Sequence, residues 1–82
     1  MALTREEILA QVNKIFIEVL DNEEIVVNYD TTAKDIEEWD SLNHIQLVVA
    51  MEKHFKIRFA SREIQSWNNT GDLINAIASK IT

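Results

Sequence analysis

The sequence has 82 residues, 46% of them hydrophobic and 27% charged, and a formal net charge of −6. A chain this short lacks the surface for the deep cleft in which most enzymes act, so we expect residues 1–82 to form a single domain that is not an enzyme. The negative charge opposes binding to nucleic acids, and the absence of cysteine excludes disulfides and a nucleophilic thiol.

Targeting signals are not evident in the sequence. Residues 1–20 lack a basic region followed by an uninterrupted apolar segment, and no apolar run approaches the length of a membrane span. We therefore expect a cytoplasmic protein. We also expect a monomer, because the acidic first half, with eleven acids and three bases in residues 1–40, would repel its own copy.

The first expected element is a helix that ends near Leu20. Thr4 and Glu7 have the spacing of a capping box, which satisfies backbone N–H groups at a helix start. Apolar residues then recur at steps of three and four, as Ile8, Val12, Ile15 and Val19, flanked by Leu9, Phe16 and Leu20.

Between Asp21 and Asp40 the helical periodicity fails. Eight acidic residues and one base, Lys34, indicate a long solvated connection. The segment also contains large apolar residues, too many for a free linker: Ile25, Val26, Val27, Tyr29, Ile36 and Trp39. We expect the connection to lie against the helices, to bury several of these side chains and to include a short helical turn.

A second helix is predicted from Ser41 to about Phe55, with Asp40 as its N-cap. One face of it is a normal core stripe, formed by Leu47, Val48, Met51 and Phe55. Leu42, Ile45 and Val49 form a second apolar stripe on the opposite side. Either the connection or a later helix covers this second stripe, or it is an exposed contact surface, and we expect partial exposure.

The remaining elements are a short helix over 61–65 and a final helix capped by Thr70. Apolar residues recur along the final helix as Leu73, Ile74, Ile77, Ala78 and Ile81. The predicted fold is therefore all-α, a small four-helix bundle with three main helices and one short helix. Trp39 and Trp67 can pack on the bundle or edge a ligand cavity, and we expect the core position, which is far more common for aromatic residues in small domains.

Ser41 stands at the start of the second helix, where a serine can belong to the cap or accept a modification. An attached phosphate is favoured at a helix N-terminus. Hydrolysis by Ser41 is not supported, because His44 is nearby but no orienting acid, oxyanion donors or nucleophile elbow accompany it. His44 and His54 are ten residues apart and do not predict a metal site.

Residues 38–47, with the sequence EWDSLNHIQL, resemble the prosthetic-group attachment motif of the acyl carrier protein family. The resemblance extends over nearly the whole chain, because the family has the same order of helices and the same long connection. It implies that a separate Mg²⁺-dependent phosphopantetheinyl transferase attaches 4′-phosphopantetheine from coenzyme A to Ser41. Acyl-loading and acyl-transfer enzymes would then use this arm, and Asp40, Leu42, Ile45 and Val49 match the family's partner-contact positions.

The sequence departs from the carriers of fatty acid synthesis, which typically line this helix with carboxylates. Asn43, Gln46, Lys53 and His54 occupy positions that are often acidic there. We therefore expect a specialised acyl carrier that serves a dedicated pathway. The alternatives are an aminoacyl or peptidyl carrier, although the paired glycines before the serine are missing, and an unmodified helical protein-interaction domain.

Overall fold

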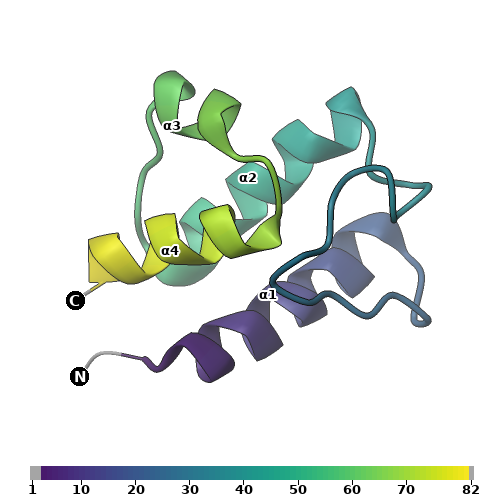
Figure 1. Ribbon diagram of the computed structural model, residues 1–82, viewed down its shortest axis with the longest axis horizontal. Coiled ribbons are helices and arrows are strands. Elements are labelled where there is room, and N and C mark those ends of the chain that lie inside the picture. Colours follow the sequence, from purple (N-terminus) through teal and green to yellow (C-terminus); the bar gives the residue numbers. More distant parts are fainter. Residues whose placement is uncertain (1–2, 82) are drawn as a thin grey trace.

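The computed structural model describes residues 3–81, apart from the side chain of Ser41. These residues form four helices and no strand: α1 (Arg5–Leu20), α2 (Ser41–Phe55), α3 (Ser61–Ser66) and α4 (Thr70–Ile81) (Figure 1). The all-α fold, with three main helices and one short helix, confirms the prediction from the sequence.

The predicted capping box starts α1. Glu7 N–H donates to the Thr4 hydroxyl over 3.2 Å, and Thr4 N–H donates to the Glu7 carboxylate over 3.0 Å. The helix ends where Asp21 adopts a left-handed conformation, with φ of 54°, and its N–H donates to the carbonyl of Ile17. The sequence thus fixes both ends of α1 by local hydrogen bonds.

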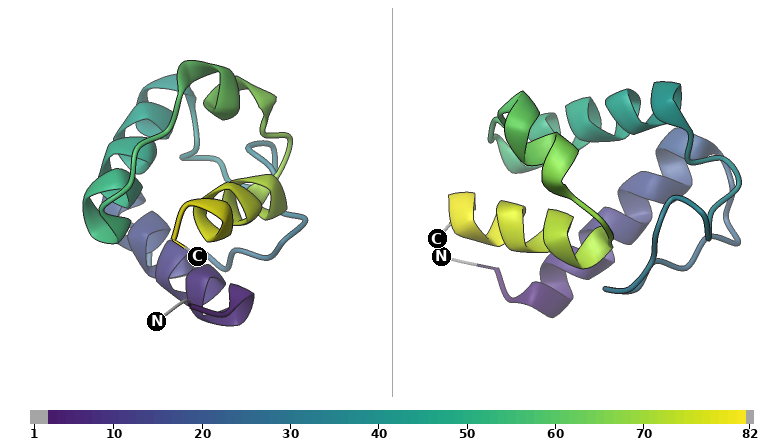
Figure 2. Two further views of the ribbon diagram at one scale, coloured as in Figure 1. Left: turned by 90° about the vertical axis from the view of Figure 1, so that its left-hand side faces the viewer. Right: turned by 45° about the horizontal axis from the view of Figure 1, so that its top comes forward.

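The core lies between α1, α2 and α4. Helix α1 packs against both α2 and α4, while α3 contacts α4. In all the views of Figures 1 and 2, α3 lies on the side of the molecule opposite the N-terminal half of α1. Side chains from the helices and from the long connection fill the core, as Ile8, Val12, Ile15, Phe16, Leu20, Ile25, Val27, Ile36, Leu47, Met51, Leu73, Ile74 and Ile77.

The connection of residues 21–40 lies against the helices, as expected. Ile25, Val27 and Ile36 are buried in it, whereas Val26 and Tyr29 are exposed. It contains turns but no helix, so the expected helical turn is absent from this described segment. An amide side chain of α1 holds it in place: Asn13 accepts a hydrogen bond from Val27 N–H and donates one to the carbonyl of Ile25.

The predicted N-cap of α4 was wrong by one residue. Thr70 is the first residue of the helix, and its buried hydroxyl donates to the carbonyl of Thr31 over 2.9 Å. The Asn69 side chain instead accepts the hydrogen bond of Asp72 N–H over 3.0 Å and so caps the first turn. The cap prediction failed because Thr70 serves a tertiary contact to the connection, which a local pattern does not reveal.

Candidate functional site

Ser41 is the first residue of α2, and local hydrogen bonds fix the backbone around it. Asp40 is the N-cap, as predicted, with its carboxylate accepting from Asn43 N–H over 2.8 Å. The Asn43 side chain donates in turn to the carbonyl of Glu38 over 2.7 Å. The predicted attachment residue is therefore held at the positive end of the α2 dipole, while its side chain lies outside the described atoms.

The second apolar stripe of α2 is exposed. Leu42, Ile45 and Val49 have exposed fractions of 67%, 62% and 41%. Neither the connection nor α3 covers them, so the alternative of a covered stripe was wrong. We call these three residues the apolar strip. It begins directly after Ser41, and an exposed patch of this kind is typical of an interaction surface.

The opposite face of α2 packs in the core, as predicted. Leu47, Val48 and Met51 are buried, and Phe55 is half-buried. The two faces therefore have different roles: one fixes the helix in the bundle and the other is free for contact with another molecule.

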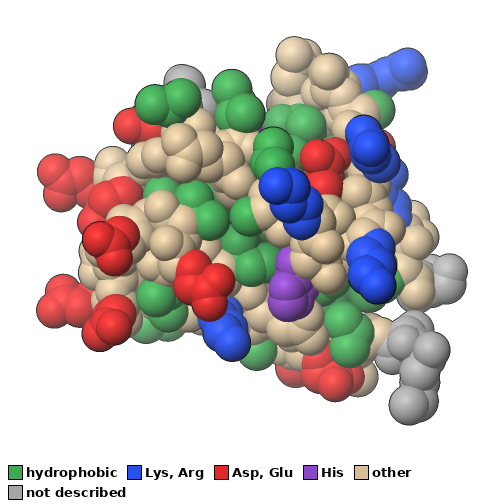
Figure 3. All heavy atoms as spheres, turned by 180° about the vertical axis from the view of Figure 1, so that it is seen from behind, with side chains coloured by type: hydrophobic (Ala, Val, Ile, Leu, Met, Phe, Trp, Pro, Cys, Tyr) green, Lys and Arg blue, Asp and Glu red, His purple; other side chains and the backbone are tan. Residues whose placement is uncertain are grey.

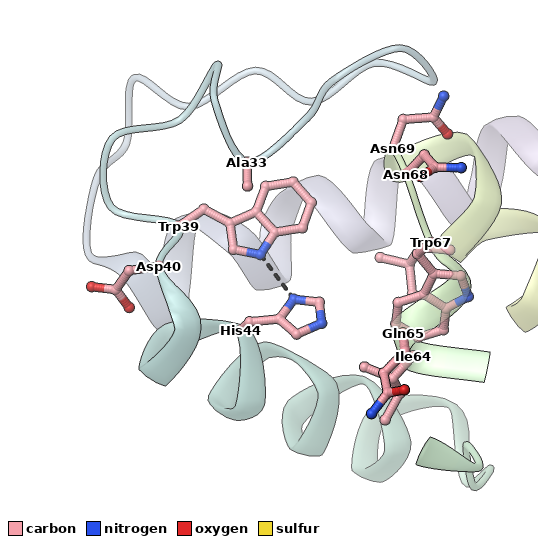
Figure 4. Close-up of a pocket in the computed structure, with 10 residues that line it drawn as sticks. Ala33, Trp39, Asp40, His44, Ile64, Gln65, Trp67, Asn68 and Asn69 are labelled. Carbon is pink, nitrogen blue, oxygen red and sulfur yellow. Dashed lines mark hydrogen bonds between the residues drawn. The ribbon is translucent and has the colours of Figure 1, made fainter. Parts of the chain in front are cut away.

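A pocket of about 750 Å³ opens beside the start of α2 (Figure 4). Its walls come from the connection, from α2, from α3, from the α3–α4 segment and from the first turn of α4. It is lined by Ala33, Trp39, Asp40, His44, Ile64, Gln65, Trp67, Asn68, Asn69 and Leu73. This volume is within the range of small-molecule sites, and the mostly apolar and aromatic walls suit an apolar chain.

Trp39 and His44 face one another in this pocket (Figure 4). The Trp39 indole N–H donates to Nδ1 of His44 over 3.0 Å, and the two rings stack at 6.0 Å between centroids. Because Nδ1 is the acceptor, the neutral ring has its proton on Nε2. Burial lowers the pKa of His44 below its ordinary value of 6.5, which favours this neutral form.

The two tryptophans both pack on the core and line the pocket. The ring of Trp39 meets Phe16 edge-on at 4.9 Å, and Trp67 meets Phe59 edge-on at 5.0 Å. Both tryptophans are half-buried. The expected core packing is therefore present, and the less favoured alternative, a place at the edge of a cavity, is present as well. His44 lies between them, with its centroid 6.2 Å from that of Trp67.

Sequence reasoning missed the place of His44 in the pocket. A signal was available, because His44 precedes Leu47 and Val48 by three and four residues and so continues the core stripe of α2 by one turn. A polar ring on that stripe needs a buried partner, and Trp39 supplies it.

Membrane-spanning helices and metal-binding clusters are both absent from the described residues. Within 3–81, no helix combines the length and the hydropathy that crossing a membrane requires. Nor do any three His, Asp or Glu side chains of this part of the chain gather closely enough to hold a metal ion.

Comparison with known families agrees with the geometry of this site. A family model described as "Phosphopantetheine attachment site" matches residues 10–77, which include Ser41 and all the residues that line the pocket. The chain is also similar to a solved structure, that of holo acyl carrier protein from Geobacter metallireducens. The sequence identity is 42%, the match covers 89% of this chain and 84% of the other, and the TM-score is 0.85.

Curated relatives give the same result. The acyl carrier protein of Acidothermus cellulolyticus is 33% identical over 96% of this chain and 94% of its own length. The acyl carrier protein of Exiguobacterium sibiricum is 28% identical over 96% of this chain and 100% of its own length. The chain therefore belongs to the acyl carrier protein family, whose members are carriers and not enzymes and have a covalently attached phosphopantetheine.

Proposed function

We propose that this chain carries acyl groups as thioesters on a phosphopantetheine arm attached to Ser41, and that residues 1–82 act as one carrier domain. The observation that supports this most is the position of Ser41 at the first residue of α2, between the exposed N-cap Asp40 and the exposed Leu42. A modifying enzyme and later partners can reach this end of the helix from outside.

The residues around Ser41 fit a phosphodiester. The N-terminal end of a helix favours negative charge, so α2 stabilises an attached phosphate. Asp40 is already held by Asn43 N–H, and this exposed carboxylate is available to orient the transferase. When bound, phosphopantetheine supplies the thiol that this cysteine-free chain lacks, on an arm that raises the effective concentration of the acyl group at each enzyme.

The pocket supports a second part of this proposal, that the apolar end of the cargo is sheltered within the carrier. Asp40 and His44 belong to its walls, so it opens next to the attachment residue. Trp39, Trp67 and Leu73 give it apolar surface, and burial of apolar groups there is favourable by roughly 25 cal/mol per Å². An acyl chain fits these walls better than a charged aminoacyl group, which favours an acyl carrier over an aminoacyl carrier.

We further propose that the carrier serves a dedicated enzyme set in the cytoplasm, as a monomer. Helix α2 contains a single carboxylate, Glu52, and it is half-buried. Gln46 and Lys53 are exposed at positions that are often acidic in carriers of fatty acid synthesis. Partner enzymes that bind carboxylates along this helix therefore have few complementary charges to contact on α2.

The attachment can be tested by mass spectrometry. Incubation of the protein with coenzyme A, Mg²⁺ and a broad-specificity phosphopantetheinyl transferase should add one phosphopantetheine. Ser41→Ala should abolish the addition, whereas Ser61→Ala, a matched change at the exposed first residue of α3, should not. If the wild type stays unmodified, an unmodified protein-interaction domain that uses the apolar strip becomes the better proposal.

The dedicated role can be tested by exchanging charges. Gln46→Glu together with Lys53→Glu should increase turnover of the holo protein by enzymes of general fatty acid synthesis, because it restores carboxylates on the exposed face of α2. Unchanged turnover would remove the electrostatic argument for a dedicated set of partners.

A further inference from the structure

A groove at the C-terminal end of α2 brings three basic side chains together. It is lined by Val49, Glu52, Lys53, Lys56, Ile57 and Arg58. We call it the basic groove. Its lining is partly apolar, through Val49 and Ile57, and its basic groups lie on exposed residues of α2 and of the segment that follows.

The basic side chains of this groove are available to another molecule. Lys53, Lys56 and Arg58 are exposed, and none of them forms an ion pair with another residue of the described chain. The one carboxylate of the groove, on Glu52, accepts a hydrogen bond from Phe59 N–H over 2.9 Å. The groove therefore presents a net positive charge that the protein itself does not neutralise.

The basic groove continues the apolar strip. Val49 belongs to both surfaces, so an exposed path runs from Leu42, next to the attachment residue, along α2 to Lys53. At a rise of 1.5 Å per residue, the path from Ser41 to Lys53 is about 18 Å long. A folded protein is wider than this path. A partner enzyme that contacts the strip while it acts on cargo at Ser41 can therefore reach the groove at the same time.

The charges of the molecule are separated in space. The connection of residues 21–40 contains eight acidic residues, whereas residues 41–82 contain five bases and three acids. Seen from behind, most carboxylates gather on the left, most lysines and arginines lie in the right half, and apolar side chains lie between them (Figure 3). A negatively charged surface is thus attracted to one end of the apolar strip and repelled from the other, which fixes its orientation.

We propose that the basic groove docks a carboxylate-lined patch on the partner enzymes of this carrier, next to an apolar contact on the strip. This inference rests on the proposed carrier function and adds the chemistry of the partner surface. It predicts partners whose docking face is acidic, the reverse of those that recognise carboxylates on a carrier helix. An anionic membrane surface is the other partner whose charge would complement these cations, and its binding is a separate outcome of the test.

The test uses the full chain after its conversion to the holo form has been confirmed by mass. The probe is a synthetic amphipathic helical peptide with a leucine stripe flanked by glutamates, and its counterpart has lysines in place of the glutamates. The glutamate peptide should shift the amide NMR signals of residues 49–58, and added salt should weaken its binding. The lysine peptide should leave these signals unchanged.

Two double variants with the same change in net charge give the decisive comparison. Lys53→Glu with Arg58→Glu should weaken binding of the glutamate peptide at least about five-fold, as expected for the loss of two exposed ion pairs. Lys14→Glu with Lys34→Glu, at exposed positions on α1 and in the connection, should leave the affinity unchanged. An equal loss of affinity in both double variants would show an effect of total charge and would overturn the proposal.

Two other results would also overturn it. One is a peptide footprint that leaves out the basic residues of the groove, Lys53, Lys56 and Arg58. The other is sedimentation of the holo protein with phosphatidylglycerol vesicles without any binding of the glutamate peptide, which would assign the groove to a membrane surface. Failure of the mass change at Ser41 would instead count against the carrier function, so the two failures can be told apart.

Discussion

The indole N–H of Trp39 lies 3.0 Å from Nδ1 of His44, and this hydrogen bond joins the end of the long connection to the first turn of α2. It bridges residues 40–43, so it helps to hold Ser41, the proposed attachment residue, at a fixed place. The bond also forms one wall of the pocket, and it requires an unprotonated Nδ1.

We predict that acid loosens this wall. Burial lowers the pKa of His44 below 6.5 in the folded state, so the unfolded chain binds the proton more readily. The stabilisation from neutral His44 is therefore fully present above the unfolded value of 6.5 and is lost as the pH falls from there towards the folded pKa. An NMR titration of the His44 ring should give a pKa below 6.5, with loss of the Trp39 indole N–H signal at the same midpoint.

His44→Gln is the matched variant for this prediction, because it removes the titration. The free energy of unfolding, measured at about pH 7.5 and about pH 5.5, should change less in the variant than in the wild type. The same pH dependence in both proteins would show that other groups cause it, and a ring that titrates at or above its ordinary value would contradict the burial argument.

Gly71 gives a second prediction, which concerns the contact between α4 and the connection. A Cβ atom at Gly71 would lie 2.8 Å from the carbonyl oxygen of Tyr29, the same oxygen that accepts a hydrogen bond from Gly71 N–H over 2.7 Å. In an open helix, Gly→Ala stabilises by up to about 1 kcal/mol. Here the clash should outweigh that gain and lower the free energy of unfolding by about 1–3 kcal/mol, measured by urea denaturation.

Asn75→Ala on the exposed side of the same helix is the control. It should be neutral or slightly stabilising, because alanine has the higher helix propensity. If Gly71→Ala behaved like Asn75→Ala, the connection would not pack against the start of α4 as closely as the structure has it.

A third prediction concerns the anchoring of the connection by Asn13. Its side-chain oxygen accepts from Val27 N–H and its nitrogen donates to the carbonyl of Ile25, so Asn13→Ala leaves two part-buried backbone groups without these partners. The free energy of unfolding should fall by about 1–3 kcal/mol. Exchange of the Val27 amide hydrogen should become faster, whereas the exposed neighbouring change Lys14→Ala should affect neither measurement.

The sequence predicted the features that depend on local patterns. The bounds of α1 and α2, the Asp40 cap and the two faces of α2 followed from apolar spacing and from capping chemistry, which act over three or four residues. The exposure of Leu42, Ile45 and Val49 was one of two open alternatives. Spacing showed that the stripe exists, but only the packing of α3 and of the connection decided whether it was covered.

The parts that failed depend on contacts between distant residues. Thr70 was predicted to be a cap because it precedes an apolar helix. Its hydroxyl instead donates a hydrogen bond to the carbonyl of Thr31, 39 residues earlier. The walls of the pocket were likewise not predicted, because Trp39, Ile64 and Trp67 meet only after the bundle has formed. Local periodicity contains no information about which side chains of separate elements meet in space.

The apolar strip leads to the last prediction, which separates binding from stability. Leu42 and Ile45 are more than half exposed, so Leu42→Ser and Ile45→Ser should change the free energy of unfolding by no more than about 0.5 kcal/mol. They should still raise the KM of the phosphopantetheinyl transferase for the carrier, because the strip is next to Ser41 and loses its apolar contact. Val26→Ser, at an apolar residue of the connection that is 72% exposed, is the matched control and should leave the KM unchanged. A large loss of stability in the strip variants would place these side chains in the packing of the bundle, and an unchanged KM would exclude the strip from the transferase contact.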